Sequence, residues 1–163
     1  NIPPVADFMI GFESGVNYYN EQNGTSVEVL GWDTAASEGS FIGNFESLDD
    51  GRSITESLVQ EGADIVMPVA GPVGLGSGVD VDWTVSASEY SDVILTSVLK
   101  NMNVAVFEAI KSVQDGTFAG GLYVGTLANN GVGLADVKGA SDELKAGLDA
   151  VKQGIIDGSI SVR

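Results

Sequence analysis

The feature that most constrains the fold is a buried-strand pattern followed at once by a glycine-rich turn, EGADIVMPVAGPVGLGS at residues 61–77. Residues 63–70 form a short apolar run with β-branched side chains, which is typical of a strand buried on both faces. Gly71, Gly74 and Gly76 follow directly, and glycines there let the backbone pass close to a ligand or a packed neighbour. Because ligands of open α/β sheets lie beyond the carboxyl ends of the strands, this turn is the best candidate for a binding edge.

The stretch before this turn begins with a helix and a strand. Residues 3–20 open with two prolines and carry apolar side chains at helical spacing. This pattern predicts an amphipathic helix that begins at the prolines and ends near Gly24. Residues 26–32 (SVEVLGW) predict the next strand, and an acidic, glycine-containing loop follows it.

A second helix is expected over residues 50–61, where apolar side chains again recur at helical spacing. Asp49 or Asp50 is a candidate N-cap for it, and Gly62 is expected to end it. The order helix, strand, helix, strand is typical of a parallel sheet with crossover helices.

The step after the glycine turn departs from this order. A parallel sheet needs a crossover of about a dozen or more residues between neighbouring strands, yet only GPVGLGSG separates Ala70 from the next candidate strand at residues 79–83. We therefore expect a helix and the start of a strand to be absent between about Ser77 and Gly78. The alternative is a tight antiparallel hairpin across the glycines.

The second half of the chain reads as mainly helical. Residues 90–114 carry apolar side chains at helical spacing, which predicts one long helix or two helical pieces. Residues 118–127 predict a strand or an extended segment, and residues 128–136 predict a turn-rich loop. A last helix is expected to begin at Ser141, a good N-cap followed by two acidic residues.

The charge and composition exclude several classes of partner and of chemistry. The chain has 23 acidic and 7 basic residues, for a formal net charge of −16, which argues against binding to nucleic acid or to anionic membrane surfaces. It has no cysteine, which excludes disulfides and thiolate metal sites. It has no histidine, which removes the commonest general base and metal ligand. No apolar run approaches the length that spans a bilayer.

Two acidic pairs remain as candidates for glycosidase carboxylates or for ligands of hard metal ions, Asp49 with Asp50 and Asp80 with Asp82. Nothing in the sequence supplies further ligands or a defined catalytic partner for them. The glycine turn also lacks the lysine of a phosphate-binding loop. The sequence therefore favours a binding protein over an enzyme, and we expect no metal or cofactor.

Several separated motifs follow one another in an order that points to one family. They are GFESGV (11–16), GNF (43–45), EGADIVMPVAGPVGLG (61–76), GVDVDW (78–83), LTSVLK (95–100) and GVGLAD (131–136). Together they resemble the basic membrane protein family, the nucleoside-type substrate-binding lipoproteins of bacterial ABC transporters. The motifs span nearly the whole chain.

This resemblance implies a type I periplasmic-binding fold, in which two α/β lobes are joined by three crossing strands and enclose the ligand at the hinge. We therefore expect an α/β fold, a parallel sheet with helices on both faces, that is incomplete here. Residues 1–83 would form a second-lobe region, residues 84–117 a hinge crossing with helices returning to the first lobe, and residues 118–163 the strand, loop and helix that complete the lobes.

The resemblance also implies ligand contacts. Phe45 of GNF would stack on a nucleoside base, whereas the alternative is a loop aromatic packed on the core. Asp80 is preferred for the ribose hydroxyls, with Asp82 nearby, because alternate residues of a strand point to opposite faces. The alternative for either carboxylate is a place in a hinge strand or at a helix cap. Lys100 would reach the sugar and its neighbouring carboxylate; the alternative is a solvated helix lysine.

Two further positions bear on the implied site. Gly71 and Gly74 would bring backbone amides to the ligand, and the alternative gives them only turn and packing roles. Trp83 stands where the family usually has glutamine, so that corner of the site departs from the pattern.

The function that the resemblance implies is capture of a purine nucleoside for uptake through a membrane permease. The alternatives are a sugar-binding protein of the same fold, a ligand-sensing receptor module, and an α/β hydrolase-like enzyme, against which the lack of histidine argues. We expect a monomer outside the cytoplasm, anchored to the membrane as a lipoprotein at the cell surface or in the periplasm.

Overall fold

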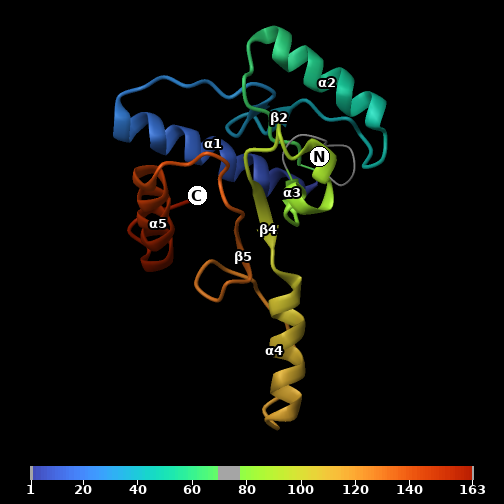
Figure 1. The fold of residues 1–163 in the computed structure, drawn as a ribbon, viewed down its shortest axis with the longest axis vertical. Helices are drawn as coiled ribbons and strands as arrows, with labels where there is room; N and C mark the ends of the chain where they lie inside the picture. Colours follow the sequence, from blue (N-terminus) through green and yellow to red (C-terminus); the bar gives the residue numbers. More distant parts are fainter. Residues whose placement is uncertain (1, 70–77, 163) are drawn as a thin grey trace. The chain divides into compact units, whose positions relative to one another are not determined.

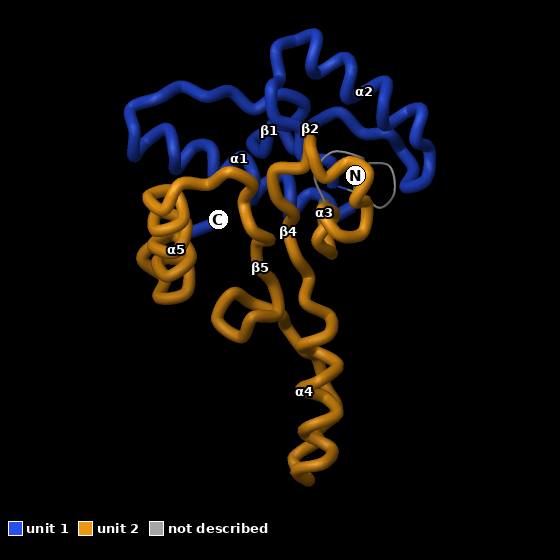
Figure 2. The backbone as a smooth tube through the Cα atoms, viewed as in Figure 1, with its two compact units in different colours: residues 1–76, 161–163 blue, residues 77–160 orange. Residues whose placement is uncertain are grey.

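The computed structural model describes residues 2–69 and 78–162. The chain divides into two compact units (Figure 2): unit 1 comprises residues 1–76 and 161–163, and unit 2 comprises residues 77–160. Among the described residues, unit 1 holds helices and a short β-hairpin, and unit 2 holds a three-stranded sheet with helices. None of the described helices combines the length and the hydrophobicity that a membrane crossing requires.

Helix α1, Pro3–Asn23, confirms the first predicted helix. Prolines stand at its start, where a missing N–H costs nothing because the first N–H groups of a helix have no partner within it. Gly24 ends the helix in the left-handed conformation, with a φ of 63°, and its N–H donates to the Asn20 carbonyl. Glu13 accepts hydrogen bonds from the backbone N–H of Thr34, at 2.9 Å, and from its hydroxyl. These bonds tie α1 to the hairpin that follows it.

Helix α2, Leu48–Glu61, confirms the second predicted helix, but its N-cap is Ser47. The Ser47 hydroxyl accepts a hydrogen bond from the Asp50 N–H at 3.3 Å. Asp49 and Asp50 lie in the first turn, where their charges interact favourably with the helix dipole. The predicted cap was wrong because serine and aspartate suit the cap position equally and the helix begins before residue 50. Gly62 ends the helix as predicted, with a φ of 111°.

The two strands predicted in unit 1 do not form among its described residues. Residues 26–30 and 63–69 are not in strands, and the hairpin of β1 (Trp32–Asp33) and β2 (Glu38–Gly39) stands instead. A strand forms only where a neighbour accepts its backbone hydrogen bonds. No backbone hydrogen bond joins residues 28–30 to another described residue. The apolar pattern was therefore insufficient to predict strands here.

Unit 2 is built on a sheet with the order β3-β4-β5, formed by Gly78–Asp80, Ser97–Lys100 and Val132–Leu134. Strand β3 runs parallel to β4, and β5 runs antiparallel to β4. Between β3 and β4 the chain forms helix α3 (Trp83–Ser86) and a 3-10 turn, Ser88–Tyr90. The buried residues on or next to these strands are Val79, Ile94, Ser97, Gly131 and Ala135.

The prediction of a helix from residue 90 onward was wrong for Ser97–Lys100, which form strand β4. A short apolar run such as that before Lys100 fits helical spacing and a buried strand alike. In the structure Ile94 and Ser97 keep only 0% and 1% of their exposure, and β4 pairs with a strand on each side. The helical part begins only with α4, Met102–Gln114, which runs away from the sheet (Figure 1).

The segments after α4 follow the predictions in part. Residues 118–126 form no helix or strand and bend at Gly121, and the turn-rich segment 128–136 contains strand β5. The predicted gap between Ser77 and Gly78, and the alternative hairpin across the glycines, involve residues 70–77 outside the described part, so both stay predictions.

The last helix, α5 (Asp142–Asp157), confirms the predicted start and the predicted cap. The Ser141 hydroxyl accepts a first-turn backbone N–H at 3.1 Å. Gly158 ends the helix with a φ of 80°. Hydrogen bonds from the side chain and the backbone N–H of Ser159 lower the pKa of the Asp157 carboxyl, so this end of the helix holds a charged carboxylate.

Candidate ligand-binding site

The carboxyl ends of β3 and β4 bring two of the predicted ligand residues together. Asp80 is the last residue of β3 and Lys100 the last of β4. Because the two strands are parallel and Asp80 stands opposite Leu99, both side chains lie at the same edge of the sheet. The Lys100 Nζ is 2.8 Å from Asp80 Oδ1, and the two side chains keep 46% and 43% of their exposure. An accessible pair of opposite charges therefore occupies the edge where α/β sheets bind ligands.

The two sides of the Asp80 carboxylate have different surroundings. Its Oδ1 is hidden from solvent, and among the described residues no well-aligned hydrogen bond reaches it. The contact at 2.8 Å with Lys100 is thus an ion pair, in which the ammonium compensates a buried oxygen. The exposed surface of the side chain belongs to its other atoms, so Asp80 can still accept a hydrogen bond from a ligand.

The backbone at Asp80 is also unusual. Its φ is 77°, in the left-handed region that residues other than glycine rarely adopt. Such a conformation costs on the order of 1–3 kcal/mol and persists only where the surroundings enforce it, often at ligand sites. The preceding residue, Val79, keeps only 7% of its exposure. This buried side chain anchors the strand that holds Asp80 in place.

Asp82 and Trp83 have structural roles in the described chain. Asp82 lies beyond the end of β3, so the alternation of strand side chains does not apply to it as predicted. It caps α3, and its Oδ1 accepts hydrogen bonds from the N–H and the hydroxyl of Thr84, at 2.9 and 2.6 Å. The Trp83 indole donates to the Val79 carbonyl at 3.2 Å. Helix capping was the alternative left open for Asp82, and its contact with a ligand stays a prediction.

On the other side of β4, an asparagine missed at the level of sequence joins the same edge. Asn101 follows Lys100 directly, and its N–H donates to the Gly131 carbonyl at 2.9 Å. Its side-chain amide donates to the Asn130 carbonyl at 2.8 Å. The loop before β5 is thereby fixed beside the carboxyl end of β4. The only sequence signal for this role is the position of Asn101 immediately after the LTSVLK motif.

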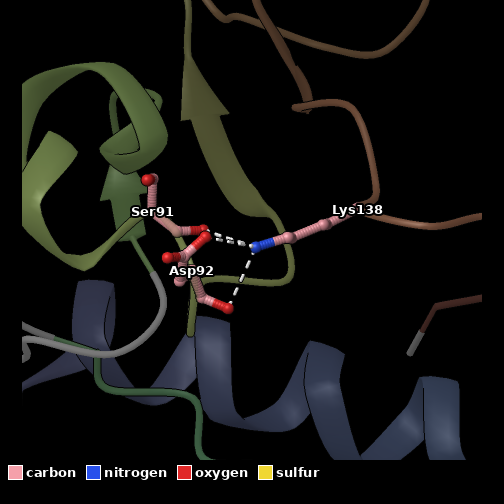
Figure 3. Close-up of polar contacts among 3 residues, drawn as sticks. All are labelled: Ser91, Asp92 and Lys138. Carbon is pink, nitrogen blue, oxygen red and sulfur yellow. Dashed lines mark hydrogen bonds and ion pairs between the residues drawn. The ribbon is translucent and has the colours of Figure 1, made fainter.

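A lysine far along the chain holds the connection between β3 and β4. The Lys138 ammonium donates to the carbonyls of Ser91 and Asp92, at 3.1 and 3.0 Å, and lies 3.3 Å from Asp92 Oδ1 (Figure 3). The Lys138 N–H also donates to the Leu95 carbonyl at 2.8 Å. These bonds fasten the segment that enters β4 to the segment that leaves β5.

Phe45 belongs to unit 1 and keeps 49% of its exposure, so it is not packed into a core. The Asn44 side chain accepts the N–H groups of Glu46 and Ser47, at 3.0 and 2.7 Å, and so shapes the turn that carries Phe45 into α2. The ring lines a mostly apolar hollow of about 840 Å³ within unit 1. The hollow is also lined by α1, α2 and the extended segments 26–32 and 63–69.

The remaining candidates form no metal-holding cluster among the described residues. Gly71 and Gly74 lie outside the described part, so their contacts with a ligand stay predictions. Asp49 and Asp50 lie in the first turn of α2. Across residues 2–69 and 78–162, no group of three or more acidic side chains is arranged to hold a metal ion.

Comparison with known proteins identifies relatives along the whole chain. The family model described as ABC transporter substrate-binding protein PnrA-like matches residues 1–163. An uncharacterized lipoprotein of Pyrococcus abyssi is 31% identical over 170 residues, which cover 93% of this chain and 39% of that protein. The ABC transporter nucleoside-binding protein BmpA of Lactococcus lactis is 28% identical over 149 residues, which cover 75% of this chain and 42% of that protein.

Solved structures support the same relationship. The crystal structure of an ABC transporter solute-binding protein from Aeropyrum pernix matches with a TM-score of 0.76 and 26% identity, and the match covers 99% of this chain and 54% of that one. A solute-binding protein of Conexibacter woesei shares the fold with a TM-score of 0.67 at 18% identity. These matches confirm the predicted fold class. The chain spans about two fifths of the curated relatives and about half of the solved structures.

Proposed function

Because the chain belongs to the family of PnrA-like ABC transporter substrate-binding proteins, we propose that it takes part in capturing a purine nucleoside for delivery to a membrane permease. The observation that carries this proposal is the Asp80–Lys100 pair at the carboxyl ends of two parallel strands. The name of the Lactococcus lactis relative, a nucleoside-binding protein, supports the choice of ligand.

The ion pair suits the sugar of a nucleoside. Ribose hydroxyls donate hydrogen bonds, and a carboxylate is the strongest side-chain acceptor for them. Lys100 holds one oxygen of Asp80, so the carboxylate is oriented before a ligand arrives. The ammonium can itself donate to a sugar oxygen. Both side chains are nearly half exposed, which leaves them accessible to a ligand from solvent.

Phe45 suits the base of a nucleoside. Its ring is half exposed on a turn that Asn44 holds in shape, and a planar base stacks well on such a face. Binding by stacking and hydroxyl recognition needs no bond to be made or broken, which agrees with a family of binding proteins rather than a class of enzymes. We propose that the protein has no catalytic activity of its own.

We also propose the lobe assignment that the sequence predicts, with residues 1–83 in a second-lobe region and residues 84–117 returning to a first lobe. Helix α4, within that second range, exposes an apolar face. Such a face is usually covered by further polypeptide. Its most exposed side chains are Met102, Val106, Phe107, Ile110 and Val113.

The names of the relatives support a proposal for the location. Those from Pyrococcus are named lipoproteins, and the family consists of substrate-binding proteins of transporters. We propose that the protein acts outside the cytoplasm, anchored to the membrane, as a monomer with a permease as its partner.

The test is calorimetric titration of the protein, purified with all the residues that its gene encodes, with purine nucleosides, pyrimidine nucleosides, free nucleobases and sugars. We expect saturable binding of a purine nucleoside and much weaker binding of its free base, since the base lacks the ribose. Binding of a free sugar without any nucleoside binding would move the assignment to sugar capture. Release of free base and sugar from a nucleoside would show that the protein is an enzyme.

A further inference from the structure

The loop before β5 is closed by one side chain. The Asn129 Oδ1 accepts hydrogen bonds from the N–H groups of Thr126 and Gly131, at 2.8 and 2.9 Å. Its side-chain amide donates to the Val124 carbonyl at 2.9 Å. Asn129 therefore satisfies backbone groups on both sides of the loop. Opening of the loop requires these bonds to break.

The next two residues, Asn130 and Gly131, form a chemically reactive pair. Asn130 is exposed, has a left-handed φ of 57°, and is followed by Gly131. In such a pair the glycine nitrogen attacks the side-chain carbonyl carbon of the asparagine, a carbon–nitrogen bond forms, and ammonia leaves. Water then opens the cyclic imide to aspartate or to isoaspartate. Glycine permits this reaction best because it has no side chain to hinder the attack.

The folded loop withholds the attacking nitrogen. The Gly131 N–H donates to Asn129 Oδ1 at 2.9 Å and to the Thr126 carbonyl at 3.0 Å. An N–H that donates to two acceptors loses its proton less readily. The same two bonds hold the nitrogen away from the Asn130 side chain. The backbone is also crowded, because a Cβ added to Gly131 would lie 2.3 Å from the Gly125 Cα. The nitrogen becomes reactive only when the loop opens.

We propose that Asn130 is a deamidation site whose rate is controlled by Asn129. Loop opening exposes the Gly131 nitrogen, and the population of the open loop sets the rate of deamidation. The product has a local consequence, because the Asn130 carbonyl accepts the Asn101 side-chain amide at 2.8 Å, next to Lys100. Isoaspartate adds one carbon atom to the backbone at this position. Either product also adds a negative charge to the loop.

The chain contains its own reference pair. Asn23 and Gly24 form a second asparagine–glycine sequence at the end of α1, where the Gly24 N–H donates to the Asn20 carbonyl. This pair lies in unit 1, whereas the side-chain bonds of Asn129 stay within the loop at residues 124–131. Deamidation of Asn23 thus serves as a reference that Asn129 does not hold, whereas a change at Asn130 alone reports opening of the loop.

The experiment follows deamidation of the folded protein at mildly alkaline pH by peptide mapping with mass spectrometry, for wild type, Asn129→Ala and Asn129→Asp. We expect wild type to deamidate at Asn130 much more slowly when folded than in urea. Asn129→Ala should raise the folded rate at Asn130 on the order of tenfold, because the bonds that close the loop are lost. Asn129→Asp should fall between wild type and Asn129→Ala, because it keeps the oxygen that accepts the Gly131 N–H but loses the amide that donates to the Val124 carbonyl. The Asn23 rate should be equal in all three.

Equal rates at Asn130 in wild type and Asn129→Ala, with Asn23 unchanged, would overturn the proposal. If Asn129→Ala unfolds, which a raised rate at Asn23 would reveal, hydrogen exchange of wild type decides instead. A protected Gly131 amide together with slow folded deamidation supports the proposal, and a rapidly exchanging Gly131 amide refutes it.

Discussion

Asp80 combines an ion pair, a hidden oxygen and a left-handed backbone in one residue. Each of these features costs free energy unless something compensates for it. Lys100 compensates for the buried oxygen, and aspartate tolerates a left-handed φ better than most residues. A residue of this kind is better explained by ligand binding than by stability alone.

Replacement of Asp80 by asparagine tests this role. Asparagine keeps the shape of the side chain and tolerates the left-handed backbone, but it removes the charge. We expect nucleoside affinity to fall by about 1.5–3 kcal/mol, the usual worth of a hydrogen bond to a charged group. Calorimetric titration measures the affinity, and a melting curve serves as the control for folding. Unchanged affinity in a folded variant would remove Asp80 from the site.

Phe45→Ala tests the stacking role. The half-exposed ring contributes little to packing, so we expect a small change in stability and a loss of about 1–3 kcal/mol in nucleoside binding. Phe41→Ala is the matched control, because Phe41 packs edge to face on Trp32 with ring centroids 6.1 Å apart. That variant should lower the stability of unit 1 instead. If Phe45→Ala unfolds the protein as readily as Phe41→Ala, the ring is a packing residue.

Among the helices and strands, short connections rely on specific side chains rather than on a large core. Helix α3 is only four residues long and depends on its cap Asp82. The approach to β4 depends on Lys138, whose ammonium satisfies two carbonyls. Each of these contacts can be removed by one substitution.

Asp82→Ala should lower the free energy of unfolding by about 1 kcal/mol, since it removes the cap of α3. Urea denaturation measures this loss, and Asp82→Asn, which keeps a capping oxygen, should recover most of it. A loss of nucleoside affinity as large as that of Asp80→Asn would instead restore Asp82 as a ligand contact.

Lys138→Met should lower the free energy of unfolding by about 1–2 kcal/mol. This loss is smaller than for a fully buried lysine, because the Lys138 side chain is half exposed. Methionine keeps much of the apolar stem and removes the charge. Hydrogen exchange at residues 91–95 should rise more than exchange in α5. Uniformly raised exchange across unit 2 would contradict a local role for Lys138.

At the scale of the whole molecule, the charge is large and of one sign. With 23 acidic against 7 basic residues, repulsion among carboxylates opposes the compact state. The chain also covers only part of its relatives, and α4 leaves apolar side chains exposed among the described residues.

Salt should therefore stabilise the protein. Raising the ionic strength from about 0.01 M to about 0.15 M shortens the Debye length from about 30 Å to about 8 Å. We expect the melting temperature to rise by a few degrees, as measured by calorimetry. An uncharged osmolyte at equal osmolality is the control. A melting temperature that stays level or falls with salt would show that repulsion does not limit stability.

The helices could be predicted from sequence because their signals are local. The prolines and Gly24 of α1, Gly62 after α2 and Ser141 before α5 each act within a few residues of the chain. The strands of unit 1 and the helix expected before Met102 were predicted wrongly. An apolar run does not specify which segment of the chain it will pair with or pack against. Strand β4 exists because β3 and β5 flank it.

The sequence by itself determined the α/β class, the ends of α1 and α2, the start of α5 and the family, because motifs and caps are local and ordered along the chain. Only the tertiary structure decided that Asp80 meets Lys100, that Asp82 caps a helix, and that Asn101 and Lys138 fasten the strands around them. Apart from the helix cap, these contacts join residues that are far apart in the chain. Their geometry depends on strand register and backbone conformation, which no local pattern specifies.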